Sequence, residues 1–98
     1  MSRYFLTLEA KQDIKEISQR IALENPAAAK RLVTEIKQKC KRAADFPEMG
    51  HSYDSLLPSL RGLFVGSYVI FYFPKKSSIQ VIRVLSGYRD LDAIFQEN

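Results

Sequence analysis

The chain has 98 residues, of which 46% are hydrophobic and 27% are charged, and its formal net charge is +4. These values exclude an intrinsically disordered chain, and no stretch approaches the roughly 20 apolar residues that cross a bilayer. We expect a single domain over residues 1–98, without signal peptide or membrane anchor. The positive charge favours an acidic partner, either nucleic acid or an acidic protein segment.

The residues that usually carry metal or cofactor chemistry are sparse. Cys40 is the only cysteine, so no internal disulfide is possible and a reducing, cytoplasmic location is expected. His51 is the only histidine, whereas a zinc site needs three or four converging ligands. The four glycines are scattered and form no phosphate-binding loop. The sequence therefore predicts neither a metal nor a cofactor.

The first half of the chain predicts a short strand followed by a helix. Residues 3–6 are apolar and aromatic, and Thr7 can cap a helix that follows. Apolar residues then recur at spacings of four, three and four, at Ala10, Ile14, Ile17 and Ile21. This period indicates an amphipathic helix that ends near Glu24.

A second helix is expected directly after the first. Asn25 can cap it and Pro26 suits its first position, where a missing N–H costs nothing. The helix should end near Asp45, because Pro47 disfavours helical geometry in the residue before it. The short connection makes the two helices an antiparallel hairpin. Residues 47–54 lack periodicity and are predicted to form a surface loop.

The second half of the chain predicts an antiparallel meander. Short runs of β-branched and aromatic residues indicate three strands, at residues 60–65, 68–73 and 79–85. Their connections suit hairpins. Residues 88–98 predict a short helix whose Leu91, Ile94 and Phe95 pack on the body of the domain. The expected fold class is α+β, with an N-terminal strand, a two-helix hairpin, a three-stranded meander and a short C-terminal helix.

Both faces of the predicted sheet are apolar. The middle strand places Val69, Phe71 and Phe73 on one face and Tyr68, Ile70 and Tyr72 on the other. The next strand would place Ile79, Val81 and Leu85 on one face and Ile82 and Val84 on the other. A helical hairpin covers one face only. The second face predicts a partner or self-association, unless the C-terminal tail and the loop after Phe46 cover it.

A group of cationic and aromatic residues stands out on the strands and the tail: Arg61, Tyr68, Tyr72, Lys75, Lys76, Arg83, Tyr88 and Arg89. Arginine grips phosphate or carboxylate in a bidentate manner, and aromatic rings stack on bases. The group could therefore serve RNA cleavage or protein docking. In a purely structural interpretation, Arg61 and Arg83 pair with carboxylates at the edge of the sheet.

The order of elements, together with several short motifs, resembles the RelE/ParE toxin superfamily over nearly the whole chain. The motifs are Ala10 with Asp13-Ile14, residues 46–50, Leu60-Arg61 and residues 68–72. The most specific segment, residues 82–91, resembles the closing strand and Arg-Asp turn of the ParE branch. A histidine often occupies the place that Ser86 holds here.

This resemblance implies two competing activities. RelE-like members cut messenger RNA on the ribosome, and ParE-like members poison DNA gyrase. The nucleases commonly carry an arginine and a tyrosine where this chain has Val69 and Phe95, and hydrocarbon side chains can neither stabilise phosphorane charge nor exchange a proton. The ParE-like activity, binding without catalysis, is therefore favoured over the RelE-like nuclease. A non-toxic interaction subunit is the third possibility.

The resemblance also implies the partners. In a type II toxin–antitoxin pair of this kind, a ParD-like antitoxin with an acidic, initially disordered C-terminal region folds across the toxin and forms a hetero-oligomer. Operator DNA would be contacted only through the antitoxin. The residues expected to contact the antitoxin or DNA gyrase are Arg61, Tyr68, Tyr72, Arg83, Tyr88 and Arg89.

Overall fold

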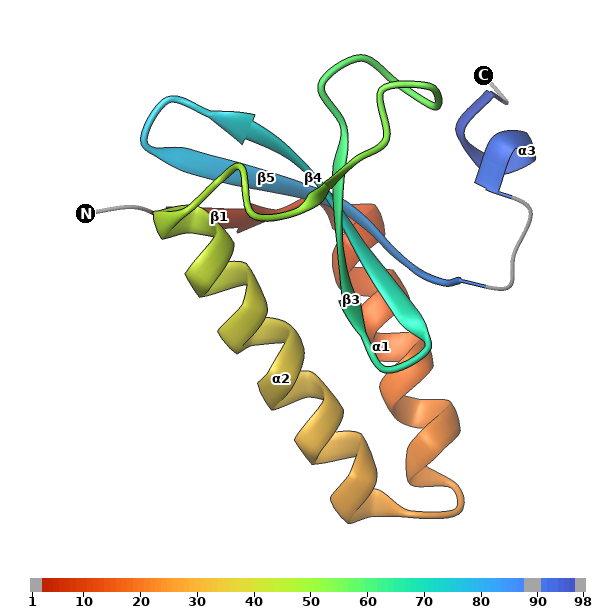
Figure 1. The fold of residues 1–98 in the computed structure, drawn as a ribbon. Helices are drawn as coiled ribbons and strands as arrows, with labels where there is room; N and C mark the ends of the chain where they lie inside the picture. Colours follow the sequence, from red (N-terminus) through yellow and green to blue (C-terminus); the bar gives the residue numbers. More distant parts are fainter. Residues whose placement is uncertain (1–2, 88–90, 97–98) are drawn as a thin grey trace.

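In the computed structural model, which describes residues 3–87 and 91–96, a five-stranded sheet packs against a helical hairpin (Figure 1). The elements are β1 (Arg3–Leu6), α1 (Leu8–Ala22), α2 (Pro26–Asp45), β2 (His51–Ser52), β3 (Arg61–Val65), β4 (Tyr68–Lys75), β5 (Ser78–Ser86) and α3 (Leu91–Gln96). The order of strands across the sheet is β1-β5-β4-β3-β2. The predicted α+β class is confirmed.

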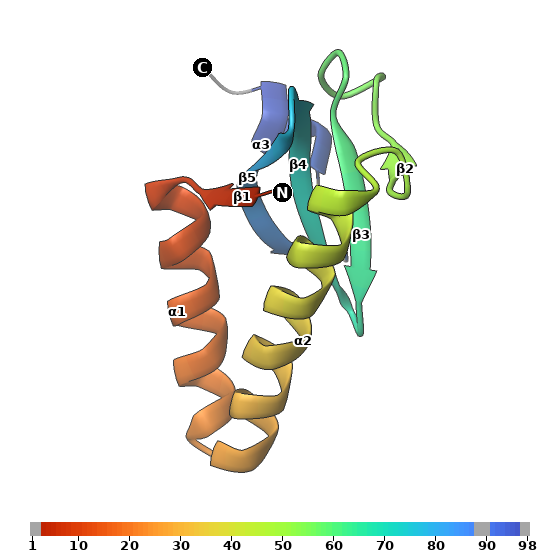
Figure 2. The same cartoon turned by 90° about the vertical axis from the view of Figure 1, so that its left-hand side faces the viewer.

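The two predicted helix caps are both present. Ala10 donates its N–H to Thr7 Oγ1 at 3.1 Å, and Ala28 donates to Asn25 Oδ1 at 3.0 Å. Each cap satisfies an N–H that has no partner within its helix, which is why α1 and α2 start where the sequence indicates. Figure 2 shows that the two helices diverge with distance from their connecting turn.

The sheet contains more pairing than the predicted meander. Strands β3, β4 and β5 form the expected antiparallel arrangement. In addition, β1 pairs in parallel with β5, with Arg3 beside Ser78 and Leu6 beside Val81. The strand β2 pairs with β3 and lies inside the segment predicted as a loop. Two residues are too few to show alternation, so no pattern in the sequence indicates β2.

A register shift changes the predicted faces of β5. Phe71 pairs with Arg83 and the next residue, Tyr72, pairs with Val81, which leaves Ile82 without a cross-strand partner. The unpaired residue reverses the alternation of side chains along the strand. The helix-facing core takes Ile79, Val81 and Val84, and the opposite cluster takes Ile82 and Leu85. The expectation that Leu85 shares a face with Ile79 and Val81 is therefore wrong.

The second apolar face is covered by the chain itself. Leu60, Val69, Phe71, Leu85 and Phe95 form a buried cluster there, against which Tyr53, Leu56, Leu57, Phe73, Ile82, Leu91 and Ile94 pack. These residues come from the segment before β3 and from α3 as well as from the sheet. The predicted packing of Leu91, Ile94 and Phe95 is confirmed. The expectation that this face needs a partner to cover it is therefore wrong.

Candidate functional site

Two of the predicted contact residues hold the backbone of residues 46–50, which we call the strap. Tyr72 donates its hydroxyl to the carbonyl of Pro47 at 2.7 Å and accepts from the N–H of Gly50 at 3.1 Å. Arg61 donates Nη1 to the carbonyls of Glu48 and Gly50, at 3.0 and 2.7 Å. Side chains from two adjacent strands thus fix the path of the chain between α2 and β2.

Tyr72 belongs to the core and is not available as a contact residue. Its exposed fraction is 0%, and burial raises the pKa of its hydroxyl. The hydroxyl is tolerated there because both of its hydrogen bonds are made inside the protein. Gly50 has to be a glycine at this point, since a Cβ would lie 2.6 Å from the Tyr72 hydroxyl and 3.0 Å from the carbonyl oxygen of Gly62. The prediction that Tyr72 contacts a partner is corrected accordingly.

Arg83 forms an ion pair at the register shift. Its Nε lies 2.7 Å from Oδ2 of Asp13 and its Nη2 lies 3.0 Å from Oδ1, while Oδ2 also accepts the N–H of Val84 at 3.0 Å. These bonds to Asp13 hold the pKa of Arg83 above its ordinary value. The predicted pairing with a carboxylate is confirmed for Arg83. It is wrong for Arg61, whose guanidinium donates to the backbone carbonyls of Glu48 and Gly50.

The predicted contact residues that the structure describes do not join one surface. Tyr68 is partly buried against the helix-facing core, and together with Asp13 it borders a small hollow of about 60 Å³. Tyr68 therefore lies near the Arg83–Asp13 pair, whereas Arg61 lies at the strap. Tyr88 and Arg89 lie outside the described residues. Contact of Arg61, Tyr68 and Arg83 with a partner stays a prediction.

The structure adds a groove that the sequence analysis did not identify. A cavity of about 250 Å³ lies between α1 and α2 and reaches β1. Its walls are apolar and its rim carries cations; the lining residues are Tyr4, Leu6, Lys11, Ile14, Lys15, Ser18, Val33, Ile36, Lys37 and Cys40. We call it the helical groove. A signal existed in the sequence, since Lys11, Lys15 and Lys37 flank the apolar stripes of both helices.

Cys40 lines the helical groove but is a poor nucleophile. Its exposed fraction is 0%, and burial raises the pKa of the thiol from 9.0 to about 12. Three pKa units reduce the thiolate population near pH 8 about a thousandfold. We expect iodoacetamide to leave Cys40 unmodified in the folded protein and to alkylate it in guanidinium chloride, as followed by mass spectrometry. Alkylation at the same rate in both states would contradict this assignment.

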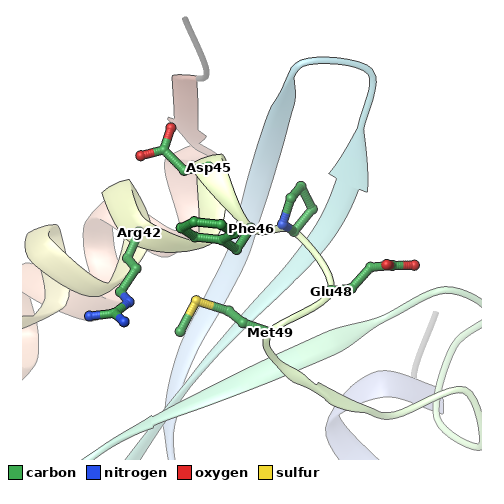
Figure 3. A pocket seen from close by; sticks show the side chains of 6 residues that line it. Arg42, Asp45, Phe46, Glu48 and Met49 are labelled. Atoms are coloured by element: carbon green, nitrogen blue, oxygen red, sulfur yellow. The ribbon is translucent and has the colours of Figure 1, made fainter.

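A second hollow lies at the strap, with a volume of about 510 Å³. Figure 3 shows Arg42, Phe46 and Met49 directed toward the same space beside the end of α2. Phe46 is 62% exposed and Met49 is 39% exposed, so this part of the surface is apolar. A neighbouring hollow of about 320 Å³ shares Arg42 and Met49 with it. No group of three metal-binding side chains occurs among residues 3–87 and 91–96.

Comparisons with known proteins place the chain in a family. The model of the ParE toxin of the type II toxin–antitoxin system parDE matches residues 4–91. Toxin ParE1 of Mycobacterium tuberculosis, from two strains, is 31% identical over 96 residues, which cover 93% of this chain and 95% of that protein. The chain therefore belongs to the ParE toxin family.

A solved structure has the same fold. It is described as the chromosomal ParDE TA system from P. aeruginosa, and the match has a TM-score of 0.72 at 22% sequence identity. The match covers 88% of this chain and 95% of the other. Within the part of the chain that the structure describes, no helix has the length and apolar character needed to span a bilayer.

Proposed function

We propose that this toxin acts by binding DNA gyrase, which blocks replication, and that a ParD-like antitoxin neutralises it. Membership of the ParE toxin family carries the proposal. The observation that supports binding over catalysis is the burial of Val69 and Phe95. Their exposed fractions are 1% and 9%, and both belong to the cluster on the second face of the sheet.

The RelE-like nuclease is the weaker alternative for a physical reason. The resemblance assigns an arginine and a tyrosine to the positions of Val69 and Phe95 in nucleases, where they would have to reach RNA. Here both positions pack inside the protein, and a polar or charged side chain would have to be buried to replace them.

The helical groove is the surface we assign to the antitoxin. Its apolar walls suit the apolar face of an amphipathic helix, and the lysines on its rim suit acidic residues that flank such a face. The net charge of +4 supports an acidic partner over a basic one. An initially disordered antitoxin segment would become ordered as it enters the groove.

Reversing the charge of the groove should weaken antitoxin binding. We expect the triple variant Lys11→Glu, Lys15→Glu, Lys37→Glu to bind the antitoxin at least tenfold more weakly in low salt, because acidic flanking residues would then meet carboxylates. The control is Lys41→Glu, Lys75→Glu, Lys76→Glu, which changes the net charge equally at exposed positions that do not line the groove. Calorimetric titration measures the affinity of both triple variants for the antitoxin. Equal losses in the two variants would show that only net charge matters.

A plasmid supercoiling reaction tests the target. Purified DNA gyrase is incubated with the protein alone and then with the product of the adjacent open reading frame. We expect loss of supercoiling or accumulation of cleaved plasmid, and we expect the neighbouring product to reverse it. Full supercoiling over a wide range of protein concentrations would remove DNA gyrase as the target, and cleavage of ribosome-bound messenger RNA would then be measured.

A further inference from the structure

One edge of the sheet is left open along part of β3. The strand β2 pairs with β3 only at Arg61 and Gly62. Beyond this point, residues 63–65 have β4 on one side and no strand of the described chain on the other. A free edge of three residues is about 10 Å long.

The backbone of Phe64 is oriented toward this free edge. Val65 and Tyr68 pair across the two-residue turn Gly66-Ser67, so they exchange hydrogen bonds between β3 and β4. Because such pairs alternate along an antiparallel ladder, Gly62 and Phe64 direct their N–H and C=O groups away from β4. Those of Gly62 meet β2 at His51. The N–H and C=O groups of Phe64 point to the same side of β3, where β2 no longer runs.

The strap explains why β2 stops. Continuing the pairing of His51 with Gly62 back by two residues would place Met49 opposite Phe64. The chain departs from that path, because the N–H of Gly50 is donated to Tyr72 and the N–H of Met49 to the carbonyl of Phe46. The hydrogen bonds that fix the strap therefore keep the edge of β3 uncovered.

Apart from its shortness, the edge carries none of the features that normally prevent pairing with another chain. In natural edge strands, charges, prolines or bulges prevent pairing with another chain. Residues 63–65 are instead Leu, Phe and Val. Phe64 is 50% exposed, and its ring contacts His51 with 5.3 Å between the ring centroids. An added strand would cover this aromatic surface on one of its faces.

The other face of an added strand would meet α2 and the strap. The hollow of about 320 Å³ that adjoins the one at the strap is lined by Glu35, Gln38, Lys39, Arg42 and Met49. The helix α2 also contacts β3. Lys39 and Arg42 form no ion pair among the described residues. The helix α2 carries six Lys or Arg residues and two carboxylates. This charge favours an acidic segment over a second copy of a chain whose net charge is +4.

We propose that the free edge of β3 receives a short, extended, acidic segment of the antitoxin as a sixth strand of the sheet. Backbone hydrogen bonds from Phe64 hold the segment, and its side chains alternate between Phe64 and the side of α2 that carries Lys39 and Arg42. This inference rests on the proposed pairing with an antitoxin. The proposed strand would use a surface separate from the helical groove, on the opposite face of α2.

The first test removes a single hydrogen-bond donor. Phe64→Pro deletes the outward N–H without touching the bonds between β3 and β4, and proline is tolerated at edge positions of this kind. Phe64→Thr also loses the aromatic ring but keeps the N–H. We expect Phe64→Pro to bind the antitoxin at least tenfold more weakly than Phe64→Thr in calorimetric titration. Equal affinities of two folded variants would overturn the proposal.

A second measurement does not depend on the proline variant folding. In the wild-type complex, amide hydrogen exchange of Phe64 should slow at least tenfold relative to the free protein, while the exposed hairpin residue Lys76 stays unchanged. An unprotected Phe64 amide in the saturated complex would overturn the proposal. Protection that rises with protein concentration in the absence of antitoxin would assign the edge to a second copy and also overturn it.

A third experiment tests whether the segment that binds this edge is acidic. Lys39→Glu with Arg42→Glu should weaken antitoxin binding more than Lys41→Glu with Lys76→Glu, although the net charge changes equally. Equal weakening would contradict the assigned acidic chemistry. If the wild-type protein does not bind the antitoxin at all, the proposed function fails; if it binds but Phe64 stays unprotected, only the β3 edge assignment fails.

Discussion

Replacing Phe71 by alanine should lower the free energy of unfolding by about 3–5 kcal/mol. Phe71 is fully buried, and its ring packs edge-on against Tyr53 and Phe95, with centroids 5.1 and 4.8 Å away. The side chain thus joins β4 to both segments that cover the second face of the sheet. The loss of the ring leaves a cavity and removes two aromatic contacts. The expected loss is a large part of the roughly 5–15 kcal/mol by which a domain is usually stable.

The matched control for Phe71 is Phe64→Ala. Phe64 is 50% exposed on the neighbouring strand, so its replacement should cost less than about 1 kcal/mol. Both variants are compared by guanidinium denaturation followed by circular dichroism. Similar midpoints for the two would mean that the second cluster contributes little to stability, contrary to the burial of Phe71.

Replacing Asp13 by alanine should lower the free energy of unfolding by about 2–4 kcal/mol. The carboxylate accepts two bonds from Arg83 and one from the N–H of Val84, and its side chain is 11% exposed. Alanine leaves a cation and a backbone donor without these acceptors in a partly buried site. The loss should be larger than for a surface ion pair, because Asp13 also fixes α1 to the register shift of β5.

Two further variants distinguish the loss of the Asp13–Arg83 interaction from the loss of a carboxylate on α1. Glu16→Ala removes an exposed carboxylate from the same helix and should cost less than about 0.5 kcal/mol. The double variant Asp13→Ala, Arg83→Met should recover part of the loss, since the unpaired cation is gone. Strict additivity of the two single effects in thermal denaturation would show that Asp13 and Arg83 do not interact.

These stability effects bear on how binding data are interpreted. Alanine at Arg83 removes its hydrogen bonds to Asp13 as well as any contact with a partner, and alanine at Tyr72 removes the hydrogen bonds that fix the strap. Weaker antitoxin or gyrase binding by either variant would therefore not by itself demonstrate a lost contact. Substitutions in the helical groove and at Phe64 avoid this overlap, because those side chains are exposed or line an open cavity.

The fold was largely predictable because its signals are local. Thr7 and Asn25 cap helices through their own side chains, and apolar residues at helical spacing define the buried stripes. The parts that were not predicted depend on partners distant in sequence. The pairing of β1 with β5, the two-residue β2 and the unpaired Ile82 follow from tertiary packing, which no short window of sequence contains.

The candidate site was predictable only in part, for a related reason. Arginine and tyrosine indicate contact chemistry, but the same groups also satisfy buried backbone, as Arg61 and Tyr72 do at the strap. Whether such a residue faces a partner or its own chain is decided by burial. Lys11, Lys15 and Lys37 became a common rim only when the two helices were placed side by side.

The parallel pairing of β1 with β5 has a consequence for the order of events during synthesis. Thr7 donates its hydroxyl to the carbonyl of Ile82, a residue 75 positions later. The hairpin of α1 and α2 leaves the ribosome first, with its apolar stripes uncovered until β5 has followed, and such long-range closure is intrinsically slow. Neither the helical groove nor the sheet edge exists in finished form before then. We therefore expect a nascent chain interrupted before β5 to aggregate and not to act as a toxin.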